Sequence, residues 1–432
     1  MFSRRRFLQC AASTGVVLGA GRTVAEIQPD TEKLPSAIAR LKSRKAQAKP
    51  ITGAERHERL DKARQLMAKG HIDAMVVSSG TSLTYFSGVR WWPSERFFAM
   101  VLPGRGDGFF VCPKFEEARA VGQISAGPFG KSAPVLTWEE DDNPYALLAA
   151  ALRDRRVATG PIGIEETVPF VFSDGLAKAA PALKFVSATA VTAGCRMVKS
   201  SHELELMRLA NKVTLTAYAA AHTSLKPGMT GRQFEELVRA AHRQLGFPNA
   251  DVFVMVGKYT ANPHGAIEEQ VIREGAVVWI DGGCTVEGYQ SDITRSFVLG
   301  KATDKMNSAF DIIHRAQQAA LKAAQVGRPC GSVDDAARKL IADAGYGPGY
   351  KFFGHRLGHG IGLDGHEWPY LVHGNELPLE AGMTFSDEPG IYIPDEFGIR
   401  LEDDMVITER GAEPMTPQSE SLEKPFEGVA IA

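Results

Sequence analysis

The sequence is poor in cysteine. Only five cysteines occur among 432 residues, and no two of them stand in a C-x-x-C spacing. A metal site built from thiolates is therefore not predicted. Cys10 lies in the N-terminal segment, whereas Cys112, Cys195, Cys284 and Cys330 are scattered through the rest of the chain. We expect these four to be buried free thiols. A disulfide among them stays open, because sequence alone cannot pair them.

Long apolar runs and an excess of one charge are also missing. No stretch reaches the ~20 apolar residues that a membrane-spanning helix needs, so stable membrane insertion is not expected. The 49 basic and 51 acidic residues give a net charge of −2, so no global positive field predicts nucleic acid as a partner. A chain of 432 residues exceeds one ordinary core, and we therefore expect two domains.

The N-terminus has its own pattern. Ser3–Gln9 contains three arginines followed by Phe-Leu, and a short apolar run from Cys10 to Gly21 comes next. This order is a charged region followed by a hydrophobic region, and it resembles a twin-arginine export signal. We expect residues 1–25 to be a signal peptide cleaved after Ala25, and residues 26–50 to be a polar linker. The mature protein is then expected to be periplasmic or otherwise exported. A disordered basic arm is the alternative interpretation.

Residues 51–190 read as an α/β domain. A helical pattern begins after Thr52 and runs to about Lys69, and a strand follows at Asp73–Ser78. Two further apolar segments, Phe97–Leu102 and Gly108–Cys112, flank a Pro- and Gly-containing turn, which predicts a hairpin.

Residues 196–432 read as a second domain with two similar halves. A capping box at Ser200-x-x-Glu203 predicts the start of a helix that runs to about Ser224, and Thr230 can cap the next helix. Further helices and strands repeat this order. The expected elements are a helix to about Leu245, strands within 252–299, helices at 304–326 and 332–344, and strands within 351–407. The order helix, helix, strands occurs twice, which suggests an internal duplication.

Each half of this second domain places two acids in apolar strands. Asp281 ends the apolar run 276–280 and Asp292 lies in the next strand, while Glu388 and Glu402 occupy a second strand pair. Residues two apart in a strand share a face, so Arg400, Glu402 and Asp404 are expected to project together.

Buried acids of this kind require a counter-charge. A carboxylate loses several kcal/mol of solvation when it leaves water, and converging carboxylates also repel one another. Two divalent ions would balance four carboxylates, and His359, in a glycine-rich segment, could complete the coordination. Oxygen ligands with one imidazole suit manganese, cobalt, iron or zinc, of which we favour manganese. The predicted metal ligands are Asp281, Asp292, His359, Glu388 and Glu402.

Five short motifs carry a family resemblance. They are Ile280-Asp-Gly-Gly, Gly288-Tyr-Gln-Ser-Asp-Ile-Thr-Arg-Ser, Gly358-His-Gly-Ile-Gly, Asp387-Glu-Pro-Gly-Ile-Tyr and Gly398-Ile-Arg-Leu-Glu-Asp. Residues 199 to about 410 thereby resemble the pita-bread metallopeptidases, the family of methionine aminopeptidase, aminopeptidase P and prolidase. Residues 85–88 and 94–96 resemble the creatinase-type N-terminal domain of the proline-directed branch. The resemblance implies a mixed α/β fold with a smaller creatinase-type domain before a pseudo-twofold pita-bread domain.

The resemblance also implies roles for individual residues. Asp281 matches a ligand of the first metal, Asp292 and Glu402 match bridging carboxylates, and His359 and Glu388 match ligands of the second metal. His264 matches a histidine that contacts the scissile region, and His366 matches one that steadies the tetrahedral intermediate. His355 matches a histidine that lines the proline side of the site. Arg400 matches an arginine that supports the site beside the bridging glutamate. One departure concerns the strand before His264, where proline-directed relatives often carry a tyrosine and residues 251–256 have none.

The expected reaction is hydrolysis of a peptide at an Xaa-Pro bond. Two metals sharing a water would lower its pKa, and Glu388 is the expected proton shuttle. A pita-bread enzyme acting on a small non-peptide substrate, as a creatinase-like amidinohydrolase or a sulfonium lyase, is the alternative, although the complete ligand set disfavours it. A non-catalytic binding module is a second alternative. The choice between dipeptidase and aminopeptidase stays open, and a homodimer is expected.

Overall fold

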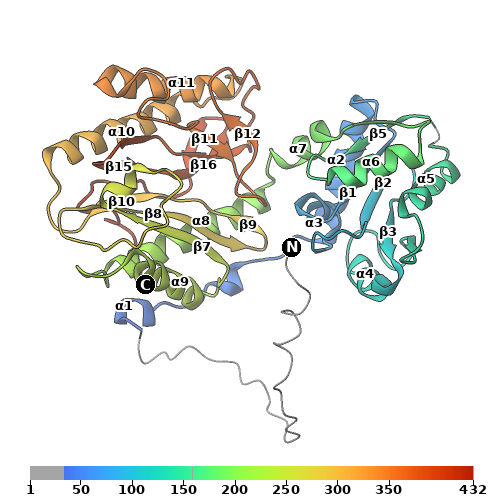
Figure 1. The fold of residues 1–432 in the computed structure, drawn as a ribbon, viewed down its shortest axis with the longest axis horizontal. Helices are drawn as coiled ribbons and strands as arrows, with labels where there is room; N and C mark the ends of the chain where they lie inside the picture. Colours follow the sequence, from blue (N-terminus) through green and yellow to red (C-terminus); the bar gives the residue numbers. More distant parts are fainter. Residues whose placement is uncertain (1–33, 158, 432) are drawn as a thin grey trace, which may run out of the picture. The chain divides into compact units, whose positions relative to one another are not determined.

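A computed structural model describes residues 34–157 and 159–431 of the chain. The predicted signal peptide and residues 26–33 of the predicted linker lie outside the described residues. The described part contains two α/β domains with separate hydrophobic cores, as expected (Figure 1). Within these ranges, no helix combines the length and apolar character needed to cross a bilayer.

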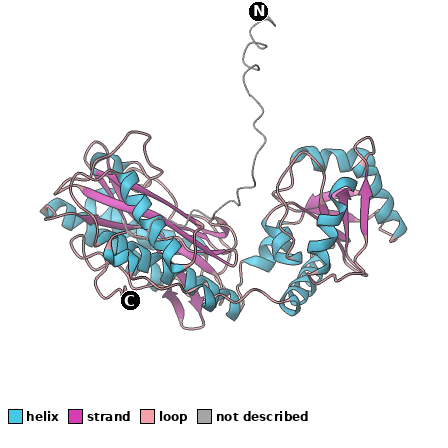
Figure 2. Ribbon diagram, turned by 90° about the horizontal axis from the view of Figure 1, so that it is seen from below, coloured by secondary structure: helices cyan, strands magenta, loops and turns pink. Residues whose placement is uncertain are grey.

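The N-terminal domain is a six-stranded mixed sheet with strand order β4-β3-β2-β1-β5-β6. Strand β2 pairs antiparallel with β1 and with β3, and the β2–β3 pair confirms the predicted hairpin. The other pairs, β3–β4, β1–β5 and β5–β6, are parallel. Side chains of β1 alternate between two cores. Met75 and Val77 pack with helices α2, α3 and α7, and Ala74 and Val76 pack with α5 and α6. Helices therefore cover both faces of this sheet (Figure 2).

The elements up to the end of this domain are α1 (Ser36–Ala39), η2 (Lys45–Gln47), α2 (Gly53–Lys69), β1 (Ala74–Ser78), α3 (Thr81–Ser87), β2 (Ala99–Pro103), β3 (Phe109–Pro113), η3 (Lys114–Glu116), α4 (Glu117–Ser125), β4 (Val135–Trp138), α5 (Pro144–Asp154), β5 (Pro161–Ile164), α6 (Phe170–Ala179), β6 (Lys184–Ser187) and α7 (Thr189–Arg196). Part of the predicted linker forms α1, in which Ile38 is buried, and the Arg44 amide donates to the Leu245 carbonyl.

The C-terminal domain begins with the first of its two helix pairs. The capping box at Ser200 and Glu203 starts α8 as predicted, and Thr230 caps α9 in the same way through Gln233. These helices pack on a sheet of order β10-β8-β7, around Tyr218, Phe234, Ile280 and other buried side chains. The elements of this half are α8 (Ser201–His222), α9 (Gly231–Leu245), β7 (Ala250–Val256), η4 (Gly257–Ala261), β8 (Val277–Val286), β9 (Tyr289–Gln290) and β10 (Arg295–Val298).

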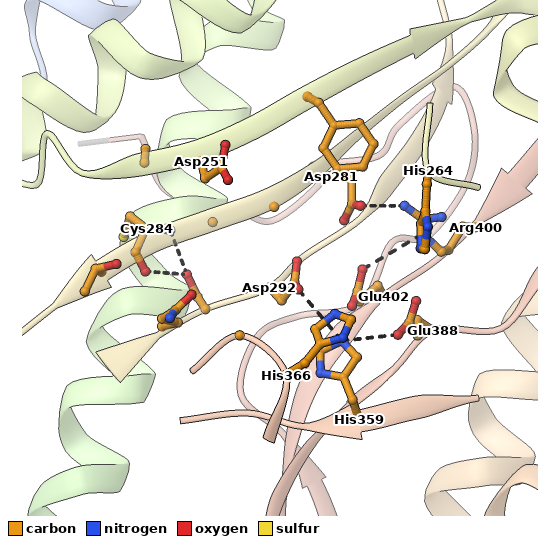
Figure 3. A pocket seen from close by; sticks show the side chains of 18 of the residues that line it. Asp251, His264, Asp281, Cys284, Asp292, His359, His366, Glu388, Arg400 and Glu402 are labelled. Atoms are coloured by element: carbon orange, nitrogen blue, oxygen red, sulfur yellow. Dashed lines mark hydrogen bonds and ion pairs between the residues drawn. The ribbon is translucent and has the colours of Figure 1, made fainter. Parts of the chain in front are cut away.

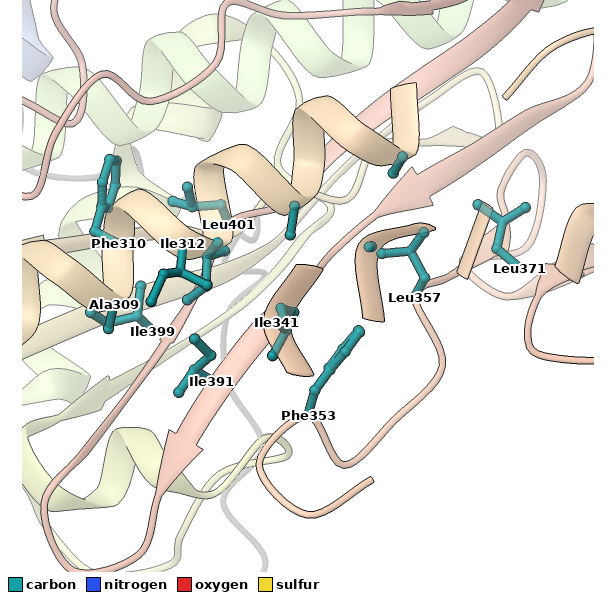
Figure 4. Packing of buried hydrophobic residues seen from close by; sticks show 14 of the residues in the cluster. Ala309, Phe310, Ile312, Ile341, Phe353, Leu357, Leu371, Ile391, Ile399 and Leu401 are labelled. Carbon is teal, nitrogen blue, oxygen red and sulfur yellow. The ribbon is translucent and has the colours of Figure 1, made fainter. Parts of the chain in front are cut away.

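The second half repeats the order of a helix pair followed by strands. Helices α10 and α11 cover a sheet of order β12-β11-β13-β16-β17, and β14 and β15 form a separate hairpin. Phe310, Ile341, Phe353, Leu357 and Leu371 lie in the core between them (Figure 4). The elements are α10 (Asp304–Ala323), α11 (Cys330–Ile341), η5 (Ala342–Tyr346), β11 (Gly358–Gly360), β12 (Glu367–Leu371), β13 (Thr384–Asp387), β14 (Gly390–Ile393), β15 (Phe397–Arg400), β16 (Asp403–Thr408) and β17 (Gly411–Pro414).

Two local expectations were wrong. Residues 351–357 form bends and irregular backbone rather than a strand. The Phe353 and His355 carbonyls of this segment accept hydrogen bonds from Arg338 of α11 instead. The segment 400–404 is not one continuous strand. Strand β15 ends at Arg400 and pairs with β14, whereas β16 begins at Asp403 and pairs with β13. Asp404 therefore does not share the cleft with Arg400 and Glu402. Its carboxylate instead accepts hydrogen bonds from Asn211 Nδ2 and from the Asp292 amide.

Candidate metal centre

Asp281 and Asp292 come together because the chain crosses itself closely at two glycines. Asp281 lies in the middle of β8, and the chain turns after β8 to bring Asp292 back along it, with the Ile293 amide donating to the Gly282 carbonyl at 3.0 Å. A Cβ atom at Gly282 would lie 2.1 Å from the Asp251 carbonyl oxygen, and one at Gly283 would lie 1.9 Å from that of Ser291. A larger residue at Gly283 would push the segment of Asp292 away from β8, and a larger residue at Gly282 would push the neighbouring strand of Asp251 away.

Glu388 and Glu402 occupy equivalent places in the second half. Asp387 at the end of β13 pairs with Asp403 at the start of β16, so Glu388 and Glu402 flank the same end of that ladder. The β14–β15 hairpin connects the two glutamates. His359 lies on β11, next to β13 in the same sheet. Each half of the domain thus contributes two acids, as the sequence pattern predicts. Their expected placement in strands was wrong for three of the four: only Asp281 lies within a strand, whereas Asp292, Glu388 and Glu402 lie in the short segments between strands.

The five predicted metal ligands converge in one cleft of about 900 Å³ (Figure 3). The ligand atoms of Asp281, Asp292 and Glu402 lie within 4.8 Å of one another, and so do those of His359, Glu388 and Glu402. Glu402 belongs to both groups. The His359 Nε2 atom lies 3.3 Å from Glu388 Oε1 and 3.9 Å from Asp292 Oδ2. The geometry is that of two adjacent cation positions sharing one carboxylate.

Arg400 and Thr294 hold the acids of the first group in place. Arg400 Nη2 donates to Asp281 Oδ2 at 2.5 Å, and its Nε donates to Thr294 Oγ1 at 2.9 Å. Thr294 Oγ1 in turn lies 2.6 Å from both Asp281 Oδ1 and Glu402 Oε2, so its one hydrogen is shared between two carboxylates. Sequence reasoning assigned Arg400 and missed Thr294, although Thr294 lies two residues after Asp292 in a motif that it quoted.

The electrostatics of the cleft require a cation. Burial raises the pKa of Asp292 well above its usual value, and the neighbouring Asp281 carboxylate raises it further. Burial likewise raises the pKa of Glu402 and brings the pKa of Glu388 to about 8. Arg400 opposes these shifts, but it is already paired with Asp281. Four carboxylates and one buried imidazole therefore face each other with insufficient positive charge.

This donor set fits two divalent ions. Oxygen-rich ligands with an imidazole suit divalent transition metals of the manganese-to-zinc series, and four carboxylates balance two double charges. The His359 imidazole is available as a neutral ligand, because burial lowers its pKa to about 3. Its Nδ1 lies 3.1 Å from the Gly360 carbonyl, an acceptor that fixes the proton on Nδ1 and leaves Nε2 free to bind a metal.

The three predicted helper histidines also line the cleft, in different states. His264 and His366 are exposed, and His366 stacks on His359 with ring centroids 3.7 Å apart. His355 is fixed at both ring nitrogens. Arg400 Nη1 donates to the Tyr392 hydroxyl, which then donates to His355 Nε2 at 2.8 Å, and His355 Nδ1 donates to the Arg356 carbonyl. Its pKa falls to about 3, chiefly through burial. His355 therefore offers the substrate a fixed neutral ring rather than a free nitrogen.

Two charged residues of the cleft were missed by sequence reasoning. Arg356 lines the cleft three residues before His359 and stacks over the Tyr370 ring, with 4.2 Å between its Cζ and the ring centroid. It forms no ion pair with any described residue. Asp251 lines the cleft from β7 and likewise has no cationic partner in the described part of the chain. In the sequence, only the position of Arg356 next to His355 could have indicated that Arg356 lines the cleft. No motif indicates a role for Asp251.

Comparisons with known proteins agree with this geometry. Residues 205–409 match metallopeptidase family M24, and residues 59–198 match the creatinase/prolidase N-terminal domain. A protein of Mycobacterium tuberculosis named probable dipeptidase PepE is 37% identical over 360 residues, which cover 82% of this chain and 92% of the relative. The chain belongs to the M24 metallopeptidase family. An Xaa-Pro dipeptidase of Lactobacillus delbrueckii is 33% identical over 373 residues, which cover 84% of this chain and 98% of the relative.

Solved structures give the same assignment. The crystal structure of dipeptidase PepE from Mycobacterium ulcerans superposes with a TM-score of 0.81 at 34% identity, covering 87% of this chain and 99% of that chain. The prolidase from Thermococcus sibiricus superposes with a TM-score of 0.76 at 26% identity, covering 85% and 98%. The expected creatinase-type domain followed by a pita-bread catalytic domain is confirmed. The protein is a metallopeptidase, and its family implies a dinuclear metal site and a peptide substrate.

Proposed function

We propose that the protein is a dipeptidase that hydrolyses the bond between an N-terminal residue and a C-terminal proline. The observation that carries this proposal is the combination of two acid groups sharing Glu402 with an unpaired Arg356 in the same cleft. Relatives with 30–37% identity are named dipeptidase or Xaa-Pro dipeptidase, which supports the same substrate class.

The metal centre needs support from several side chains. Bound divalent ions supply a water of lowered pKa and polarise the peptide carbonyl. Arg400 and Thr294 orient Asp281 and Glu402 for this purpose. Ser386 Oγ donates to Glu388 Oε1 at 3.2 Å and so fixes the carboxylate that we assign to moving a proton to the proline nitrogen. His366 has no hydrogen-bond partner among the described residues and is placed to donate to the developing oxyanion.

Arg356 distinguishes a dipeptidase from an aminopeptidase. A dipeptide presents its carboxylate one residue beyond the scissile bond, whereas a longer peptide presents a neutral amide there. Arg356 lies beside the His359 and His366 end of the cleft, and after burial its positive charge is a further cause that lowers the pKa of both imidazoles. A guanidinium can bind a carboxylate through two parallel hydrogen bonds. Stacking on Tyr370 leaves this guanidinium held in place without neutralising it.

The Xaa-Pro bond itself fits the fixed wall of the cleft. This bond is a tertiary amide without an N–H group, so the enzyme needs no acceptor for that position. His355, held by Tyr392 and the Arg356 backbone, presents a neutral ring beside Arg356. A rigid ring can pack against proline without competing for hydrogen bonds.

Three finer proposals accompany this function. Manganese is the proposed metal, supported by four oxygen donors and the absence of thiolate among the five predicted ligands. Export is proposed from the order of charged and apolar residues in 1–21, and a homodimer is proposed from the family resemblance. Metal analysis of the purified protein, fractionation of the producing cells and sedimentation analysis test these in turn.

The decisive experiment compares Ala-Pro with Ala-Pro amide and with Ala-Pro-Ala-Ala. We expect kcat/KM for Ala-Pro to exceed that for the amide by at least about tenfold, because the carboxylate is a charged hydrogen-bonding partner. Arg356→Met should abolish this preference while metal content stays unchanged, and Arg356→Lys should keep part of it. Arg208→Met, on the exposed face of α8, is the matched control.

The same assay separates the alternatives. Equal cleavage of the dipeptide and the tetrapeptide would identify an aminopeptidase instead. Turnover of creatine or dimethylsulfoniopropionate without turnover of Ala-Pro would identify a small-molecule enzyme and overturn the proposal.

A further inference from the structure

The cleft continues beyond the metal ligands along strands β7 and β8. Phe253 of β7 lies directly opposite Asp281 of β8, and Asp251 lies directly opposite Gly283. Directly paired residues, and residues two apart, point to the same face of a sheet. Asp251 therefore faces the cleft. It lies two residues, or about 7 Å, along β7 from Phe253, which is opposite Asp281.

Gly283 leaves this end of the cleft open. A side chain at this position would point to the same face as Asp251, where its Cβ atom would lie 1.9 Å from the Ser291 carbonyl oxygen, so only glycine fits and no side chain stands next to Asp251. The other residues that line this end are neutral, and they include Asn249, Thr285 and Gln290. The result is a polar recess with one acidic side chain.

Positive charge in the cleft is confined to the opposite end. Among the described lining residues, only Arg356 and Arg400 carry a fixed positive charge, and Arg400 is paired with Asp281. Asp251 forms no ion pair and no side-chain hydrogen bond with any described residue. Figure 3 shows Asp251 on β7, across the cleft from Glu388, His359 and His366. An unpaired acid and an unpaired cation thus lie on opposite sides of the metal centre.

This polarity orients a dipeptide. If the C-terminal carboxylate binds Arg356, the N-terminal residue lies beyond the metal ligands and directs its side chain toward Asp251. We propose that Asp251 is a specificity-determining residue, which makes this recess a subsite for a cationic N-terminal side chain. The preferred substrates are then Arg-Pro and Lys-Pro. This inference rests on the proposed dipeptidase function.

The chemistry of the two basic side chains fits the recess. Lysine carries its charge on a flexible four-carbon stem, and arginine presents a planar fork that matches a carboxylate. Asp251 is exposed, so its attraction is screened by solvent, and the expected selectivity is modest. A substrate with glutamate as its N-terminal residue would bring a like charge to Asp251 and would bind less well.

Citrulline provides a matched test, because it has nearly the shape of arginine but no charge. We expect wild-type kcat/KM for Arg-Pro to exceed that for citrulline-Pro by about fivefold at low salt. This ratio should fall as ionic strength rises and should approach one in Asp251→Asn. The charge reversal Asp251→Lys should instead favour Glu-Pro over Gln-Pro. Asp141→Asn, an exposed acid of the N-terminal domain, should leave every ratio unchanged.

Each outcome decides the inference. An Arg-Pro to citrulline-Pro ratio near one in the wild type, or a ratio unchanged by Asp251→Asn, overturns the role of Asp251 while Ala-Pro hydrolysis still supports the dipeptidase. Absence of hydrolysis of all these dipeptides by the manganese-loaded protein overturns the proposed function and this inference together. The salt dependence of the wild-type ratio gives a result that needs no variant.

Discussion

Replacing Asp292 by asparagine should have opposite effects on metal binding and on the stability of the metal-free protein. The carboxylate of Asp292 accepts no hydrogen bond from any described residue, and His359 Nε2 lies 3.9 Å from its Oδ2 atom. The substitution therefore removes a charge at nearly constant shape and breaks no contact. It also removes one ligand of the proposed metal centre. We expect metal affinity and Ala-Pro hydrolysis to collapse, while the metal-free fold becomes more stable.

The magnitude follows from the spacing of the acids. Ligand atoms of Asp281, Asp292 and Glu402 lie within 4.8 Å of one another. At an effective dielectric constant of about 20, two charges at that distance repel by about 3 kcal/mol. Proton uptake limits this repulsion, because burial and the neighbouring acids raise the pKa of Asp292. A gain of about 1–3 kcal/mol is therefore expected, equivalent to about 2–4 °C of unfolding temperature per kcal/mol in a domain of this size.

The effect should depend on pH in a defined direction. A carboxyl whose pKa is raised by folding binds a proton more tightly in the folded state, so it stabilises the fold at low pH and loses that contribution as pH rises through the raised pKa. For Asp292, whose pKa is raised well above its usual value chiefly by burial, this loss grows as the pH rises above the ordinary carboxyl range of about 4. The advantage of Asp292→Asn over wild type should accordingly be larger at pH 8 than at pH 5.

Thermal unfolding in excess chelator, calorimetric titration with manganese, and Ala-Pro hydrolysis measure the three quantities. Asp141→Asn, which carries the same change on an exposed loop, is the control for a general charge effect. An Asp292→Asn protein that unfolds at or below the wild-type temperature without metal would refute the claim that the acids are crowded. Undiminished manganese binding by the Asp292→Asn protein would refute this claim as well.

Three other perturbations test separate parts of the structure. Burial lowers the pKa of His242 to about 4, so this residue gains a proton only in the unfolded chain between about pH 6.5 and pH 4. When the pH falls from 7 to 5, His242 should contribute about 2 kcal/mol of lost stability, so urea unfolding of His242→Gln should show a loss smaller than that of the wild type by about this amount. Thr294→Val should weaken manganese binding by about 10–100-fold in calorimetry, with unchanged circular dichroism and with recovery in Thr294→Ser. Glu367→Gln leaves Lys199 buried without a carboxylate and should lower the free energy of unfolding by about 3–5 kcal/mol, partly restored by a second change, Lys199→Met.

The pattern of acids in apolar strands was enough to predict the centre of the site. Asp281, Asp292, Glu388 and Glu402 stand out because ionised groups in buried strands are costly without a cation, and that argument needs no coordinates. The helix starts at Ser200 and Thr230 were equally predictable, because a capping box is a local interaction within four residues. Such features depend on short-range chemistry that the sequence states directly.

Other features depend on register and on contacts between distant segments. Asp251 faces the cleft only because β7 pairs with β8 in one register; a shift by one residue would turn it to the opposite face. The state of His355 was also beyond reach, because it depends on Tyr392, 37 residues later, and on Arg400 behind it. The break of the strand between Arg400 and Asp403 separates two pairings that sequence alone does not show, because β15 pairs with β14 and β16 pairs with β13.

Arg400 explains how two similar halves build one asymmetric site. Its Nη2 atom binds Asp281 of the first half, while its Nη1 atom binds Tyr392 of the second half, which fixes His355 on the substrate wall. The guanidinium is planar, so these directions are set relative to each other, and a lysine could not reproduce both. Any movement of Asp281, a proposed metal ligand, would thereby be transmitted to His355, which we propose lies beside the substrate proline. A single buried cation thus links metal geometry to substrate fit, and the repeat of helices and strands alone would not provide that link.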